Sequence, residues 1–366
     1  MRHGIAILLT ALVIGGAAHA DWKMDSFMIS LWGGPHDEAT AKAYADAHFN
    51  TVMAGYDMLQ LCRKHGLRVM VMDGTPELAA KHKDDAGVWG WFVCDEPGEA
   101  QFEEVAGRVA KLHEADPNHP AYVNLMAWMN LKPYFETVKP RLLSYDYYQW
   151  WWGTQNHFGR LEAHRAAALE AGVPLICWVE ANADPRWERG QPGATYLPDN
   201  EPKLRQSVYT ALAYGVKGIQ WFVESLILER GEDDKPLPKL QKAGEDSKAI
   251  NAELEALGPV LVRLRSVDVF HTEPVPPSAK AVPTDLWVQA KGRHLTLGLF
   301  ADEKGTSYVM VVNRDIGMRR AARIRFGRPV TRVERFDRQT RGWVEVPVRA
   351  VRMMLKAGDG ELLRVE

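Results

Sequence analysis

The sequence predicts a (β/α)8 barrel followed by a small antiparallel β-sandwich. Eight short apolar runs alternate with helical patterns across residues 27–223, which is typical of parallel strands joined by helices. From Thr284 onward the hydrophobic period changes to two, which indicates antiparallel strands. The chain has 366 residues, a length that suits a barrel and an accessory domain.

The apolar runs are nearly continuous rather than alternating, as expected for strands that are buried on both faces of a parallel sheet. They cover residues 27–32, 49–53, 67–72, 88–94, 121–126, 142–147, 174–179 and 218–223. Helices are expected between them, at residues 38–48 and 57–66, after Pro97, at residues 160–171, and between Pro202 and Gly215.

The C-terminal third begins with a charged, proline-rich stretch at residues 231–238, followed by a helical pattern up to residue 265. Alternating strands are then expected at residues 286–291, 294–300, 307–313, 321–326, 333–337 and 362–365. We therefore expect a barrel over residues 21–235, a connecting helix over 236–265, and a β-sandwich over 266–366.

The first twenty residues have the pattern of a secretory signal peptide. A basic start precedes the apolar residues 5–13, and small residues at Ala18 and Ala20 mark a cleavage site. The apolar stretch is too short for a membrane anchor, so we expect cleavage after Ala20 and a bacterial periplasmic or extracellular protein. With 45 basic and 47 acidic residues, the chain favours neither nucleic acid nor an anionic membrane as a partner.

Two of the apolar runs end in a glutamate. The fourth runs into Asp95-Glu96-Pro97, and the seventh ends at Glu180. Because a barrel gathers the C-terminal ends of its strands on one face, we expect both carboxylates there, about 5–6 Å apart. Such a pair can cleave a glycosidic bond with retention of configuration. Considered on its own, each residue has a structural explanation. Glu96 could be a carboxylate that balances the dipole at a helix N-terminus, and Glu180 could be a solvated loop acid.

Other carboxylates could share this chemistry. Asp95 could orient Glu96, bind a sugar hydroxyl, or serve a structural role. Glu224 follows the eighth run and is a rival nucleophile. An inverting enzyme that uses Glu96 with Glu224 or Asp146 is a further alternative.

Aromatic residues gather at the same strand ends, and the chain contains 13 tryptophans. Sugar rings stack on flat aromatic side chains, while their hydroxyls need a few polar groups. The aromatic cluster also contains Trp128, Tyr145, Tyr148, Trp152 and Trp187. The residues predicted to bind substrate are Trp32, Asp95, Asn124, Tyr147, Trp150, Trp151 and Trp221.

The sequence contains no dinucleotide, phosphate-loop, zinc-protease or nucleophile-elbow motif, and its histidines show no metal-ligand spacing. The three cysteines, Cys62, Cys94 and Cys177, are expected to be buried apolar residues. No cofactor or metal is therefore expected.

In these residues and their order along the chain, the sequence resembles the clan A glycoside hydrolases, and most of all family 42-like bacterial proteins. The resemblance rests on the segment from Gly90 to Pro97 (GWFVCDEP), together with ADPNHPAYVN, SYDYY, LAYGVKGIQWF and LKAGDGELL. It implies Glu96 as acid/base and Glu180 as nucleophile. Most clan members have Asn where this chain has Asp95.

The sequence thus predicts a secreted, retaining glycoside hydrolase that acts on a β-linked oligo- or polysaccharide. The alternative from another class is a non-catalytic barrel that binds carbohydrate through its rim aromatics.

Overall fold

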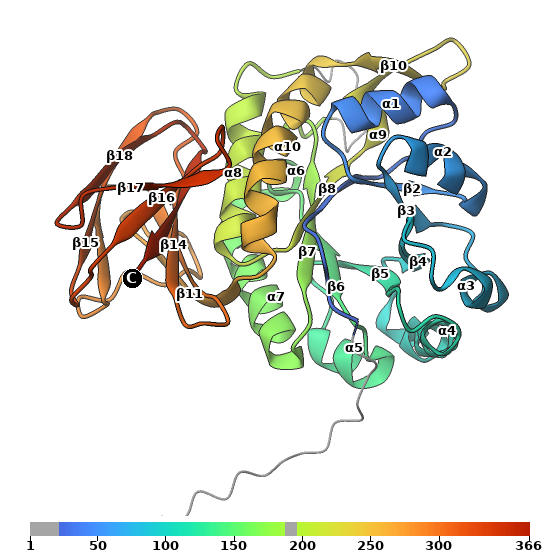
Figure 1. The fold of residues 1–366 in the computed structure, drawn as a ribbon, viewed down its shortest axis with the longest axis horizontal. Coiled ribbons are helices and arrows are strands. Elements are labelled where there is room, and N and C mark those ends of the chain that lie inside the picture. Colours follow the sequence, from blue (N-terminus) through green and yellow to red (C-terminus); the bar gives the residue numbers. More distant parts are fainter. Residues whose placement is uncertain (1–21, 187–195) are drawn as a thin grey trace, which may run out of the picture.

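The computed structural model describes residues 22–186 and 196–366, and it confirms the predicted fold class. A barrel of eight parallel strands is followed by two antiparallel sheets, with α8 and α10 between the two parts (Figure 1). The expected signal segment at residues 1–20 and Trp187 lie outside the described residues.

The barrel strands are hydrogen-bonded in the order β1-β8-β7-β6-β5-β4-β3-β2. Backbone bonds from Asn50 to Ile29 (3.0 Å) and from Met53 to Gly33 (3.0 Å) link β2 to the β1 segment and bring the ring nearly to closure. The strand bounds are β1 Met28–Leu31, β2 Thr51–Ala54, β3 Arg68–Val71, β4 Val88–Asp95, β5 Ala121–Met126, β6 Leu143–Asp146, β7 Leu175–Glu180 and β8 Gly218–Phe222.

The helices of the barrel lie around this ring. Local signals start some of them: the Asp37 side chain caps α1, and Thr75 followed by Pro76 starts α3. Their bounds are α1 Glu38–Asp46, α2 Leu59–Lys64, α3 Pro76–His82, α4 Phe102–Ala115, α5 Leu131–Val138, α6 Gln149–Trp152, α7 His157–Ala171, α8 Asn200–Ala213, α9 Glu224–Ile227 and α10 Lys242–Leu261, with short 3-10 turns at Tyr56–Met58, Glu99–Gln101 and Thr154–Asn156.

The stretch expected to connect the two domains contributes to the barrel wall. Its first part forms strand β10 (Pro236–Leu240), which pairs antiparallel with β9 (Leu228–Arg230), and the helix begins only at Lys242. Asn251 of α10 accepts a hydrogen bond from Trp221 Nε1 (2.8 Å) and donates to the Ala47 carbonyl (3.0 Å). Helix α10 therefore holds strand β8 and the end of α1 together.

The C-terminal domain is a sandwich of two antiparallel sheets. The larger has the order β11-β13-β14-β19-β16-β17, and the smaller has the order β12-β15-β18. Their bounds are β11 Arg265–His271, β12 Val288–Lys291, β13 Leu295–Ala301, β14 Ser307–Asn313, β15 Arg320–Phe326, β16 Val333–Asp337, β17 Gly342–Glu345, β18 Val351–Leu355 and β19 Gly360–Val365.

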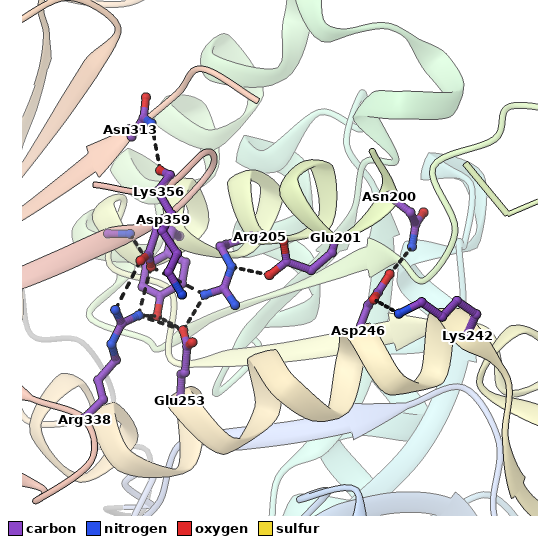
Figure 2. A network of polar contacts seen from close by, with 12 residues as sticks. Asn200, Glu201, Arg205, Lys242, Asp246, Glu253, Asn313, Arg338, Lys356 and Asp359 are labelled. Carbon is purple, nitrogen blue, oxygen red and sulfur yellow. Dashed lines mark hydrogen bonds and ion pairs between the residues drawn. The ribbon is translucent and has the colours of Figure 1, made fainter. Parts of the chain in front are cut away.

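A charged network joins the sandwich to the barrel helices (Figure 2). Arg338, which follows β16, donates to Glu253 of α10 (2.7 Å) and to Asp359 (2.9 Å). Arg205 of α8 also donates to Glu253 (2.6 Å) and to Glu201 (2.7 Å). Because Arg205 and Asp359 are buried, the pairing of these charges fixes how the larger sheet lies on α8 and α10.

Candidate active site

A cleft opens where the barrel strands end. It has a volume of about 460 Å³, within the range of small-molecule sites. Its walls combine acidic and aromatic side chains from several strand ends, as expected at the C-terminal face of a barrel. The lining residues are Trp32, Asp95, Glu96, Asn124, Asp146, Tyr148, Trp151, Trp152, Trp178, Phe222, Val223, Ser225 and Leu226.

Three carboxyl groups meet in this cleft: Asp95, Glu96 and Asp146. Asp95 ends β4, and Glu96 follows it with a left-handed backbone (φ 46°), so two consecutive side chains both reach the cleft. Asp146 ends β6 and is buried, within hydrogen-bonding reach of Glu96. Burial, the hydrogen bond with Glu96 and the charges of Glu96 and Asp95 raise the pKa of Asp146 to about 9.

Asp146 therefore carries a proton at neutral pH, because burial and the neighbouring carboxyl groups disfavour its ionised form. The side chain of Asp95 is open to solvent, yet the surrounding cleft walls and the charge of Glu96 raise its pKa. A hydrogen bond from Asn124 Nδ2 (3.1 Å) opposes this rise by stabilising the ionised form of Asp95.

A buried chain of polar side chains orients Asn124. Trp178 Nε1 donates to the Tyr122 hydroxyl (2.9 Å), which lies 2.8 Å from Ser144 Oγ. Ser144 in turn donates to Asn124 Oδ1 (2.9 Å). Since its oxygen is occupied by a donor, the Asn124 amide must turn its nitrogen toward Asp95.

The structure does not bring Glu180 to the wall of this cleft. Its side chain is fully buried (0% exposed), and its Oε1 accepts a hydrogen bond from the Trp150 backbone N–H (2.7 Å). Its Oε2 has no partner among the described residues. Burial raises the pKa of Glu180 to about 8, so this carboxyl is protonated at neutral pH.

Glu224 is engaged elsewhere. Its Oε1 accepts a hydrogen bond from the Tyr44 hydroxyl, and its Oε2 forms an ion pair with Arg230 (3.2 Å). Burial raises the pKa of Glu224, whereas Tyr44 and Arg230 oppose that rise. Its neighbours Val223 and Ser225 line the cleft, but Glu224 itself does not.

The predicted substrate-binding residues separate into two groups. Trp32, Asp95, Asn124 and Trp151 line the cleft together with Glu96. Tyr147, Trp150 and Trp221 do not: the Tyr147 hydroxyl donates to the Gly153 carbonyl (2.8 Å), and Trp150 Nε1 donates to the Lys203 carbonyl (3.1 Å). Trp221 is fully buried and faces Asn251 on the outer side of β8.

Several lining residues were not predicted as binding residues. Tyr148 and Trp152 belong to aromatic runs that the sequence marked only as a cluster, while Trp178 and Phe222 lie within strands. The alternation of side chains along a strand was the sequence signal that could have identified Phe222 as a lining residue. Successive side chains point to opposite faces of a strand, so Phe222 and Trp221 cannot both face the inside of the barrel.

Among the described residues, no group of three or more His, Cys, Asp or Glu side chains could hold a metal ion. Within the same described ranges, no helix combines the length and apolar character needed to cross a membrane.

No family model and no curated protein matches the chain. Solved structures do match its fold. A putative alpha-galactosidase/melibiase from Bacteroides fragilis is 12% identical, with 93% of this chain and 79% of that chain covered and a TM-score of 0.53. An alpha-amylase from Geobacillus thermoleovorans is 8% identical, with 94% and 99% covered and a TM-score of 0.53.

A GH27 b-L-arabinopyranosidase from Geobacillus stearothermophilus is also similar, at 8% identity, with 93% and 96% covered and a TM-score of 0.50. These likenesses show that a barrel with a C-terminal β-domain is an architecture found among glycoside hydrolases. At such low identity they concern the fold alone. The closer resemblance to family 42-like proteins stays a prediction.

Proposed function

We propose that this protein is a glycoside hydrolase with Glu96 as its proton donor. The observation that carries the proposal is the cluster of Asp95, Glu96 and Asp146 in an aromatic-lined cleft at the C-terminal mouth of the barrel. Hydrolysis of a glycosidic bond needs one protonated and one ionised carboxyl group beside the anomeric centre. Asp146, with its pKa raised to about 9, supplies the protonated form at neutral pH, and the Asn124 amide stabilises the ionised form of Asp95.

The roles follow from the environment of each group. Glu96 is more exposed than the buried Asp146, so it reaches the leaving oxygen, and Asp146 returns a proton to it along their shared contact. Asp95, whose ionised form is stabilised by the hydrogen bond from Asn124, activates water or stabilises positive charge on the sugar ring. Trp32, Trp151 and Trp152 supply flat faces for the sugar, and the motif resemblance favours a β-linkage.

A retaining mechanism through Glu180 makes a different demand. The Glu180 carboxyl would have to lose its proton and reach the cleft wall, which requires the α6 segment above it to move. Attack by water activated by Asp95 needs no such movement. The two routes give opposite anomers, so proton NMR of the first-formed product separates retention through Glu180 from inversion through Asp95.

One observation favours a second candidate, a non-catalytic carbohydrate-binding barrel. Carboxyl groups in hydrogen-bond contact, such as Glu96 and Asp146, are closer than the roughly 5 Å of a retaining pair. The deciding experiment screens aryl glycosides and oligosaccharides with the wild type and with Glu96→Gln. Hydrolysis that depends on Glu96 supports the enzyme, whereas binding without turnover in both proteins supports the binding barrel.

A further inference from the structure

The small sheet of the C-terminal domain has one apolar and one basic face. Its apolar face forms the sandwich core with the larger sheet, through Val288, Ala322, Ile324, Val351, Met353 and Leu355. Because strand residues alternate between faces, the residues between them point outward. The outward residues are Gln289, Lys291, Ala321, Arg323, Arg325, Arg352 and Met354.

Three cations form a row across this outer face. Lys291 of β12 lies directly opposite Arg323 of β15, which in turn lies directly opposite Arg352 of β18. Arg325 stands two residues along β15, opposite Gln289. Like charges at directly opposed strand positions destabilise a sheet, so folding alone does not account for this row.

No acidic side chain neutralises the row. The strands β12, β15 and β18 contain no Asp or Glu. Within the described ranges, none of Lys291, Arg323, Arg325 and Arg352 forms an ion pair, and Arg323 Nε is buried without a hydrogen-bond partner. The remaining cation of these strands, Arg320, is different because it is paired with Asp315.

The basic face lies far from the cleft. From the barrel outward, helix α8 packs against β13 and β14 of the larger sheet, and the small sheet covers the other side of that sheet. The basic face is thus the outermost layer of the molecule, on the side of β15 and β18 turned away from the barrel (Figure 1). A ligand held there leaves the cleft free.

We propose that this basic face binds a linear acidic polysaccharide through its carboxylate groups. Three of the four unpaired cations are arginines, whose planar guanidinium groups match carboxylates bidentately. Neighbouring strands are about 4.8 Å apart, so the row presents closely spaced positive charges to a multivalent chain. Proteins that bind membranes or single-stranded nucleic acid add several apolar or aromatic anchors, whereas the outward positions here contain no aromatic residue and only one large apolar side chain, Met354.

The test uses the full chain carrying Glu96→Gln, so that no hydrolysis disturbs binding and the result does not depend on the proposed activity. Binding to polygalacturonate and to neutral dextran is measured by calorimetry, at low and high salt. The triple variant Arg323→Gln/Arg325→Gln/Arg352→Gln is compared with Lys83→Gln/Lys111→Gln/Lys139→Gln. The control removes the same charge from exposed positions on the barrel.

We expect polygalacturonate to bind and dextran not to bind. The arginine variant should bind polygalacturonate at least about tenfold more weakly, the lysine control should match the parent, and salt should weaken binding. The melting temperature of the arginine variant should equal or exceed that of the parent, because opposed like charges are removed.

Equal weakening by the two triple variants would overturn the proposal, because net charge alone would then explain binding. The proposal would also be overturned if the folded Glu96→Gln parent did not bind polygalacturonate. Tighter binding of anionic phospholipid vesicles or of a single-stranded oligonucleotide than of polygalacturonate would also overturn it, and would assign the face to that other class of partner.

Discussion

The carboxyl group of Glu180 accepts a hydrogen bond from the backbone N–H of Trp150 at 2.7 Å, so a residue at the end of β7 holds the start of helix α6. The same helix carries Trp151 and Trp152 into the cleft wall. We therefore predict that Glu180 affects the cleft by positioning the helix that carries its aromatic wall.

The first prediction separates this positioning role from a nucleophilic one. Glu180→Gln keeps an oxygen that accepts from Trp150, so activity should stay within severalfold of the wild type. Glu180→Ala removes the acceptor and leaves a cavity, which should destabilise the protein by about 2–4 kcal/mol and raise KM more than it lowers kcat. Kinetics and thermal melts measure both effects. A folded Glu180→Gln protein without turnover would restore Glu180 as nucleophile.

The second prediction concerns pH and stability. The folded pKa of Glu180 is about 8, against an ordinary value of 4.5, so folding takes up a proton between these values. Its contribution to stability is fully present below pH 4.5 and declines by ~1.4 kcal/mol per pH unit until pH 8. Glu180→Gln does not titrate, so its melting temperature should fall less between pH 5 and pH 8 than that of the wild type. Parallel curves would contradict the buried, protonated state.

The barrel was predictable from the sequence because parallel strands buried on both faces leave near-continuous apolar runs, and eight such runs were visible. Short helices were harder to find. Helix α3 begins with the cap Thr75-Pro76, but with only seven residues it carries little periodic signal.

The candidate site was only partly predictable. A strand end fixes where a residue lies along the barrel, which placed Asp95, Glu96 and Asn124 in the cleft. It does not fix which element covers that residue. Glu180 ends its strand as expected, but helix α6 lies above it, and this cover depends on contacts with α8 that are distant in sequence.

The third prediction tests the proton donor. Glu96→Gln removes the carboxyl group that donates the proton, so kcat on natural glycosides should fall by roughly 10²–10⁴-fold. Substrates with dinitrophenyl leaving groups hardly need the proton, because the leaving group has a low pKa. Their rate of glycosidic bond cleavage should therefore fall much less. Glu99→Gln is the control, because Glu99 is exposed three residues away and does not line the cleft. Similar losses on both substrate types would argue against acid catalysis by Glu96.

The fourth prediction concerns the aromatic wall. Trp152 lines the cleft and makes an edge contact with the half-exposed Trp128 (5.3 Å between ring centroids), which extends the wall toward the rim. Trp152→Ala should raise KM for oligosaccharides more than for small aryl glycosides, because a distant sugar loses its stacking partner. Trp287→Ala, in the C-terminal domain, should leave both values unchanged. An equal rise on both substrates would indicate a structural role for Trp152.

The last prediction concerns the junction of barrel and sandwich. Arg338 is the shared partner of Glu253 and Asp359, and Asp359 is buried. Arg338→Gln removes one of the two guanidinium groups that neutralise these carboxylates and leaves only Arg205, which lies 2.6 Å from Glu253 and 3.5 Å from Asp359. It should therefore destabilise the protein by up to about 3–5 kcal/mol. Arg341 offers a matched control three residues away, since it pairs with Glu255 at the surface, where an ion pair contributes about 0–1 kcal/mol.

Chemical denaturation of Arg338→Gln and Arg341→Gln measures the difference. We expect the first variant to unfold at clearly lower denaturant concentration and the second to follow the wild type. The loss of stability in Arg338→Gln should shrink when Asp359 is also changed to Asn, because the excess negative charge in this buried network is then removed. If both single variants unfold with the wild type, the charges around Arg338 do not hold the two domains together, and the contact of α8 with the larger sheet alone must do so.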